Sequence, residues 1–341
     1  MKRIKIENIG SLYNEICKVQ DLYLPVRKGG ATNFAKYEEG VQVDIDTLQT
    51  VKSAKDLFFP QSEDIIDFKV SGKNIEIKDA RQKSNPFVLF GVRGCDLKSF
   101  EVLDKVFLQE PVDTMYKEKR DAVTVITLAC NNPESSCFCK VFGVDASNPK
   151  GDVQAVISNG YMYFEPLTEK GSELISKLNC LEDGDASDVE TEKANIVGKI
   201  ENLPFSKLDL SAFKGENLME LFDRKEWEEL SKACLGCGTC TFVCPTCQCF
   251  DIRDFETNDG VKRFRCWDSC MYSEFTKMAA ENPRKTQMQR YRQRFMHKLV
   301  YFPANNGGEY SCVGCGRCVK KCPQSLNIVK VIKKLGGNKN D

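Results

Sequence analysis

The sequence predicts an α+β protein in which an α/β domain, residues 1–210, precedes a mostly helical domain, residues 211–341. Short apolar runs alternate with a helical pattern in the first part, as in an α/β layer. Twelve of the 18 cysteines follow residue 230, so the second part has a different composition. A length of 341 residues also fits about two domains.

The first domain contains a predicted strand, helix and second strand. Residues 87–92 and 122–128 are short apolar runs, which are typical of buried strands. Between them, apolar residues at spacings of three and four predict a helix over 96–107, with Asp96 as an acidic N-cap. This strand–helix–strand order predicts an α/β layer.

Three further segments lead to the second domain. Residues 153–164 predict a hairpin, because Asn159-Gly160 separates two apolar runs. Residues 181–210 hold 8 acids and 3 lysines with little periodicity, so we interpret them as the boundary region. A helix is predicted over 217–232, and it leads directly into the first cysteine run.

Composition excludes several functional classes. Lys+Arg and Asp+Glu are both 49, which argues against a nucleic-acid binder. A single histidine nearly excludes histidine-based catalysis and multi-histidine metal sites. No apolar run approaches the roughly 20 residues of a membrane helix, and the N-terminus does not resemble a signal peptide. We therefore expect a cytoplasmic protein, in which 18 cysteines indicate metal or redox chemistry.

Two cysteine runs, residues 234–245 and 312–323, share the spacing C-x2-C-x2-C-x3-C-P. This spacing is typical of ferredoxin-like domains with two [4Fe-4S] clusters, in which the fourth cysteine of each run ligates the other cluster. The predicted ligands of cluster 1 are Cys234, Cys237, Cys240 and Cys322, and those of cluster 2 are Cys312, Cys315, Cys318 and Cys244.

Glycines inside both runs support this interpretation, because they allow positive φ and a close approach of backbone amides to cluster sulfurs. They are Gly236, Gly238, Gly314 and Gly316. A zinc ribbon is the alternative, but zinc sites usually pair two C-x2-C knuckles. A sirohaem site is also disfavoured, because its cysteine spacing would need Cys234 and Cys240, which the first run already uses.

A third cluster is predicted in the first domain. Cys95 and Cys130 each follow a predicted strand, and ligands gather at the carboxyl edge of parallel strands. Cys137 and Cys139 follow on a nearby loop, which makes four thiols that can converge. The alternative is that these are ordinary buried thiols, since cysteine is often buried.

Other features have less specific interpretations. Cys17 and Cys180 look isolated, whereas Cys247, Cys249, Cys266 and Cys270 would bind a further metal, shield the clusters or pack beside them. Arg290, Arg294 and Lys298 would share one helix face. They would offset cluster charge, dock an acidic partner or form a solvated face. We expect His297 to be a packed residue rather than a catalyst.

These motifs resemble the 4Fe-4S dicluster electron-transfer chain of anaerobic sulfite reductases and the related β subunits of sulfhydrogenases. The resemblance covers most of the chain and is densest at Gly91–Lys98, Cys130–Cys139, Cys234–Phe250, Trp267–Met271 and Cys312–Cys318, with Arg290–Lys298 similar in style. One departure is Gly94, where sulfhydrogenase members tend to have proline.

The resemblance implies an iron–sulfur electron-transfer subunit that is not itself the site of sulfite reduction. Its partners would be an FAD-containing flavoprotein subunit that oxidises NAD(P)H and a sirohaem subunit or another terminal reductase. Our first hypothesis is an anaerobic sulfite reductase complex, and the alternative is a sulfhydrogenase or another NAD(P)-linked redox complex. A non-redox metal-stabilised scaffold is a third hypothesis. No Gly-x-Gly-x-x-Gly follows a strand, so we expect no nicotinamide site in this chain.

Overall fold

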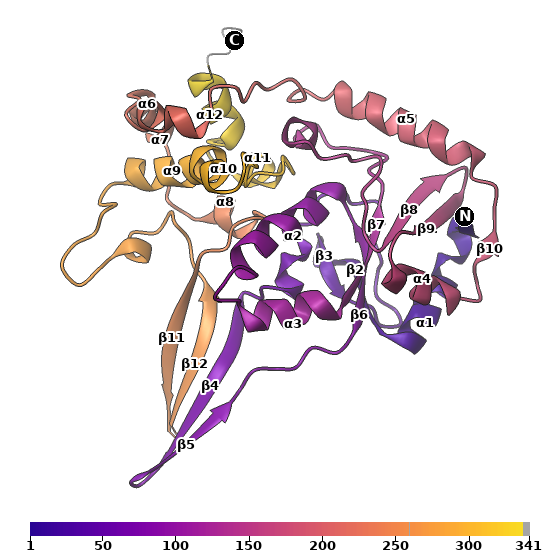
Figure 1. Cartoon of the computed structure of the whole chain (residues 1–341), viewed down its shortest axis with the longest axis horizontal. Coiled ribbons are helices and arrows are strands. Elements are labelled where there is room, and N and C mark those ends of the chain that lie inside the picture. Colours follow the sequence, from indigo (N-terminus) through magenta and orange to yellow (C-terminus); the bar gives the residue numbers. More distant parts are fainter. Residues whose placement is uncertain (259, 337–341) are drawn as a thin grey trace.

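The computed structural model describes residues 1–258 and 260–336. An eight-stranded sheet organises the N-terminal part, with strand order β10-β1-β9-β8-β7-β6-β2-β3 (Figure 1). Its strands are β1 (Lys2–Lys5), β2 (Asp21–Lys28), β3 (Ala31–Lys36), β6 (Phe87–Val92), β7 (Val123–Leu128), β8 (Val153–Ser158), β9 (Tyr161–Pro166) and β10 (Glu182–Asp183). The four central strands, β2, β6, β7 and β8, are parallel, and the outer pairs are antiparallel. The predicted α/β layer is therefore confirmed.

Helices cover both faces of this sheet, because alternate residues of its central strands are apolar on both sides. The helices are α1 (Ile9–Val19), α2 (Gly94–Phe107), α3 (Thr114–Ala122), α4 (Glu169–Ser176) and α5 (Ser187–Glu201). Val88 and Ile126 pack in one core with α1 and α4, whereas Leu89 and Val125 pack in another core that includes α2. Parallel strands buried on both faces bring the ends of β6 and β7 to one edge.

The predicted hairpin is confirmed by β8 and β9, which pair antiparallel. Asn159 and Gly160 have φ angles of 48° and 78°. Positive φ at both central positions is the requirement of the turn that Asn-Gly favours.

Three predictions of helix detail need correction. The N-cap of α2 is Arg93, and Asp96 lies in the first turn with its side chain buried. The helix predicted over 217–232 is two helices, because the Trp227 indole donates to the carbonyl of Leu221 at 2.7 Å. In a continuous helix that carbonyl would accept from residue 225. Residues 181–210 include α5, which packs on β8, so this segment is more ordered than a linker.

A second, four-stranded sheet extends from the body as a narrow arm (Figure 1). Its order is β11-β12-β4-β5, and all its pairs are antiparallel. The strands are β4 (Ser62–Ser71), β5 (Asn74–Asp79), β11 (Phe250–Thr257) and β12 (Gly260–Trp267). This sheet joins strands from both sides of the predicted boundary at residue 210, and that boundary stays a prediction.

The C-terminal part consists of short helices around a separate apolar core. They are α6 (Leu218–Phe222), α7 (Glu226–Ser231), α8 (Thr239–Phe242), α9 (Gln287–Met296), the π-helical turn η6 (His297–Tyr301), α10 (Phe302–Asn305), α11 (Arg317–Lys321) and α12 (Ile328–Leu335). The 3₁₀ turns of the chain are η1 (Ile6–Asn8), η2 (Ala54–Leu57), η3 (Cys139–Phe142), η4 (Gly215–Asn217) and η5 (Glu274–Thr276). Trp227, Tyr291, Phe295 and Ile332 belong to this core, and Phe138 of the N-terminal part joins it. The two parts of the chain therefore share packing.

Candidate iron–sulfur sites

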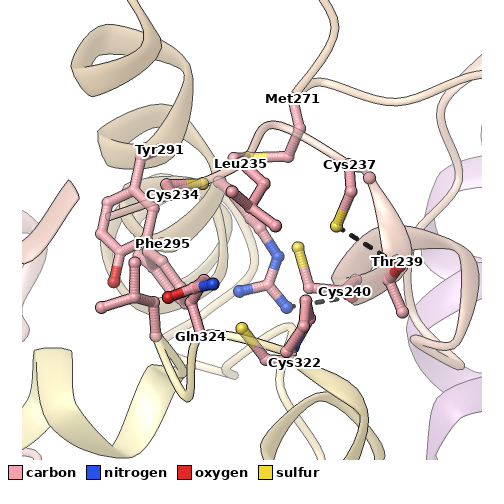
Figure 2. Close-up of a pocket in the computed structure, with 14 residues that line it drawn as sticks. Cys234, Leu235, Cys237, Thr239, Cys240, Met271, Tyr291, Phe295, Cys322 and Gln324 are labelled. Carbon is pink, nitrogen blue, oxygen red and sulfur yellow. Dashed lines mark hydrogen bonds between the residues drawn. The ribbon is translucent and has the colours of Figure 1, made fainter. Parts of the chain in front are cut away.

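The first cysteine run lies on the loop before α8 and lines a pocket of about 420 Å³. Cys234, Cys237 and Cys240 come from this run, and Cys322 comes from the residue that ends α11. Figure 2 shows these four cysteines around one space. The structure therefore brings together the four cysteines that the sequence predicted for cluster 1.

Arg294 tests whether this pocket fits an iron–sulfur cluster. Its side chain lines the pocket and is 2% exposed. The guanidinium donates to the carbonyl of Cys240 at 3.0 Å, while its Nε and Nη1 atoms have no partner among the described residues. Buried donors without an acceptor are costly. The sulfides of a [4Fe-4S] cluster accept such hydrogen bonds, so the pocket fits this group.

The second run, with Cys312, Cys315 and Cys318, meets the fourth cysteine of the first run. Burial raises the pKa of Cys312 and Cys315, and charges on Cys318 and Cys244 raise both further. These mutual effects require that the sulfurs lie near each other. The structure thus gathers the four cysteines predicted for cluster 2.

The third group lies at the carboxyl edge of β6 and β7, as predicted. Cys130, Cys137 and Cys139 are buried, and Cys95 is partly buried. Burial raises the pKa of Cys139, and the neighbouring Cys130 and Cys137 raise it further. Cys139 also acts on the pKa of Cys95, so the four predicted cysteines form one group.

Three residues that the sequence analysis missed join the second and third groups. The Gln49 amide donates to the Sγ of Cys137 at 3.2 Å and to the carbonyl of Cys315 at 2.8 Å. Arg317 makes two hydrogen bonds to Asp96, at 2.6 and 2.7 Å, and both side chains are at most 2% exposed. Asp96 is adjacent to Cys95, and Arg317 lies in the second run. Only the position of Arg317 inside a cysteine run gave a signal in the sequence.

Buried cations surround the cysteine groups. Of the three basic residues predicted on one helix face, Arg294 and Lys298 are buried and Arg290 is half-buried. Burial lowers the pKa of Lys298, but Cys244, Cys247 and Cys312 reverse this effect and hold its pKa above the ordinary value. A solvated face is therefore the wrong interpretation for Arg294 and Lys298. His297 is packed, as predicted, and burial lowers its pKa to about 4.

The remaining cysteines divide into a buried set and outliers. The sulfurs of Cys244 and Cys247 interact directly, as do those of Cys249 and Cys270. Cys266 lies apart, beside Asp251 and Arg253. Cys17 is exposed, and the Cys180 amide donates to Glu15. Across residues 1–258 and 260–336, no three Cys, His, Asp or Glu side chains form a site for a single metal ion.

Comparisons with known proteins agree with this arrangement. A family model described as a 4Fe-4S dicluster domain matches residues 233–326, which include both runs. The chain is 31% identical to "Sulfhydrogenase 2 subunit beta" of Pyrococcus furiosus over 349 residues, with 98% of both chains covered. This protein belongs to the sulfhydrogenase beta-subunit family. No solved structure matched the chain.

Family membership makes the chain an iron–sulfur electron-transfer subunit with two [4Fe-4S] clusters. The relative's name favours the sulfhydrogenase branch, which was our alternative, over the anaerobic sulfite reductase branch. Its name also describes one subunit of a larger assembly. Among the described residues, no helix has both the length and the apolar character to span a bilayer.

Proposed function

We propose that this chain is the electron-transfer subunit of a sulfhydrogenase-type complex, and that it carries three [4Fe-4S] clusters between its partner subunits. The single observation that supports this proposal is the row of three four-cysteine groups. Cys240 of the first group interacts with Cys318 and Cys244 of the second. Cys315 of the second group interacts with Cys139 and Cys95 of the third.

The second group therefore has a neighbour on each side. When bound, each cluster takes up and releases one electron. The chain contributes the positions: crossed ligands hold the first two groups together, and the Asp96–Arg317 pair and Gln49 hold the second against the third. The order of the relay is thus first, second and third group, in either direction.

The proposed ligand sets follow this grouping. The first set is Cys234, Cys237, Cys240 and Cys322, the second is Cys312, Cys315, Cys318 and Cys244, and the third is Cys95, Cys130, Cys137 and Cys139. Arg294 donates hydrogen bonds at the first set, which stabilises the negative charge there.

Iron counting and two cysteine variants test this proposal. Protein purified without oxygen should contain about 12 irons, four for each of three clusters. Cys322→Ser should damage the cluster of the first run and Cys244→Ser that of the second, with Cys17→Ser as the control. About eight irons would remove the third cluster. Damage confined to each variant's own run would contradict the crossed ligation, and clusters that dithionite does not reduce would favour the scaffold hypothesis.

Partner identification separates the two branches of the family resemblance. We propose a flavoprotein subunit that oxidises NAD(P)H on one side and a sulfhydrogenase-type acceptor subunit on the other. Complexes purified anaerobically through this chain should contain flavin and no sirohaem. Sirohaem in stoichiometric amount would instead support the sulfite reductase branch.

A further inference from the structure

One helix places two cations inside the space between the first two cysteine groups. Arg294 on α9 and Lys298 on η6 are one helical turn apart, with 2% and 3% exposure. Neither side chain forms an ion pair with a carboxylate in the described part of the chain, residues 1–258 and 260–336. A buried charge without a counterion is strongly disfavoured. These positions therefore need negative charge on the sulfur side.

The two cations face different sets of sulfurs. Arg294 interacts with Cys240 of the first group and with Cys318 and Cys244 of the second. It therefore lies between the two groups. Its unpaired Nε and Nη1 atoms remain available as donors on this side of the helix.

Lys298 faces the second group. It donates to Thr246 Oγ1 at 2.8 Å and to the carbonyl of Ser311 at 3.2 Å. Thr246 Oγ1 lies 3.3 Å from the sulfur of Cys244, and Ser311 precedes Cys312. None of the strongest electrostatic neighbours of Lys298 belongs to the first group apart from the shared Arg294.

A third buried cation lies on the same side. Lys55 is 2% exposed and donates to the carbonyl of Cys247 at 2.7 Å, while its ammonium lies 3.9 Å from the centre of the Trp267 ring. Its charge interacts with Cys247 and Cys244. The second group therefore has Arg294, Lys298 and Lys55 beside it, whereas the first shares only Arg294.

Charge near a cluster changes how readily it accepts an electron. Reduction adds one negative charge, so a buried cation favours the reduced form, and the effect is strong where water is excluded. Resting on the proposed function, we propose that Arg294 raises the reduction potentials of both ferredoxin-type clusters and that Lys298 raises that of the second alone. The second cluster, in the middle of the row, is then easier to reduce than the first.

Redox titration of the full chain, purified without oxygen and followed by electron paramagnetic resonance, tests this assignment. Lys298→Met should move the potential of the second cluster to more negative values and leave the first in place. Arg294→Gln should move both, and Arg294→Lys should move both by less. The control is Arg292→Gln on the same helix, because Arg292 stacks on Phe222, 3.5 Å from the ring centre, and donates to its carbonyl.

Each outcome decides the proposal. Signals are assigned to clusters with the Cys322→Ser and Cys244→Ser variants, and iron content shows whether a variant is fully metallated. Metallated variants with unchanged potentials, or equal shifts of both clusters in Lys298→Met, would overturn it. If a variant loses iron, the unmodified chain still decides, because a first cluster that is easier to reduce than the second contradicts the proposal. Absence of any reducible cluster would instead refute the proposed function itself.

Discussion

The two cysteine runs have the same spacing but different surroundings. Side chains cover the first run: a Cβ added at Gly236 would meet Gln287 Oε1 at 2.8 Å, and Leu235 is 65% exposed. Backbone covers the second run, because a Cβ at Gly314 would overlap the carbonyl of Phe138, and the Phe138 amide donates to the Gly314 carbonyl at 2.9 Å. Identical ligand spacing therefore does not imply equal rigidity or equal exposure of the two sites.

Substituting one glycine in each run should break this comparison most strongly. Both glycines have positive φ, so alanine costs about 1–2 kcal/mol of backbone strain at either position. Gly314→Ala adds an overlap with backbone that cannot move, so we expect loss of the second cluster. Gly236→Ala meets only a flexible side-chain end and should retain both clusters.

Iron content and the spectroscopic signal of each cluster, measured on protein purified without oxygen, check this result. Retention of both clusters in Gly314→Ala would show that the loop of Phe138 yields. Equal loss in both variants would show that backbone strain alone decides.

The buried ion pair that holds the second run should have the next largest effect. Asp96→Asn leaves Arg317 buried without a counterion, and we expect the free energy of unfolding to fall by about 3–5 kcal/mol. Asp254→Asn breaks an exposed pair with Arg263 and should cost at most about 1 kcal/mol. Anaerobic urea unfolding of the metallated protein measures both. Equal effects would mean that burial of the pair contributes no stability.

The only histidine of the chain reports on the packing behind the first two groups. Burial, followed by charges on Lys298 and Arg284, lowers the pKa of His297 to about 4 from an ordinary 6.5. Between these values the unfolded chain binds a proton that the folded chain does not. The stability from neutral His297 is therefore complete above pH 6.5 and falls by up to roughly 3 kcal/mol as the pH drops to 4.

Nuclear magnetic resonance of the imidazole checks this directly, since one histidine gives one assignable set of signals. The wild-type signals should not titrate between about pH 7.5 and 5.5. His297→Gln should show a weaker loss of stability over the same range. A midpoint near 6.5 in the folded protein would contradict the buried, neutral state.

The smallest expected effect concerns exposure of the two runs. Cys237 is exposed, whereas Cys315 is buried. We expect air to destroy the first cluster several-fold faster than the second, because oxidants reach it directly. Decay of the two cluster signals after exposure to oxygen measures this ratio. Equal decay rates would show that the cover over the second run does not restrict access.

Parts of the site were predictable because they depend on local sequence. The C-x2-C-x2-C-x3-C-P runs predicted the glycines with positive φ, and the structure has them. The parallel pairing of β6 and β7, which brings Cys95 and Cys130 to one edge, followed from two apolar runs. Helix details were less predictable, since Asp96 carries the composition of an N-cap but pairs with Arg317, 221 residues away.

The sequence by itself determined which cysteines gather, because ligand spacing limits what a short loop can reach. Only the tertiary structure decided what surrounds them. Gln49, Lys55 and Arg317 approach the cysteine groups from segments without any motif. Arg294 and Lys298 look like ordinary surface cations in the sequence and are buried in the fold. Burial and electrostatic neighbours depend on contacts between distant segments, so the fold, and not the motif, sets the environment of each site.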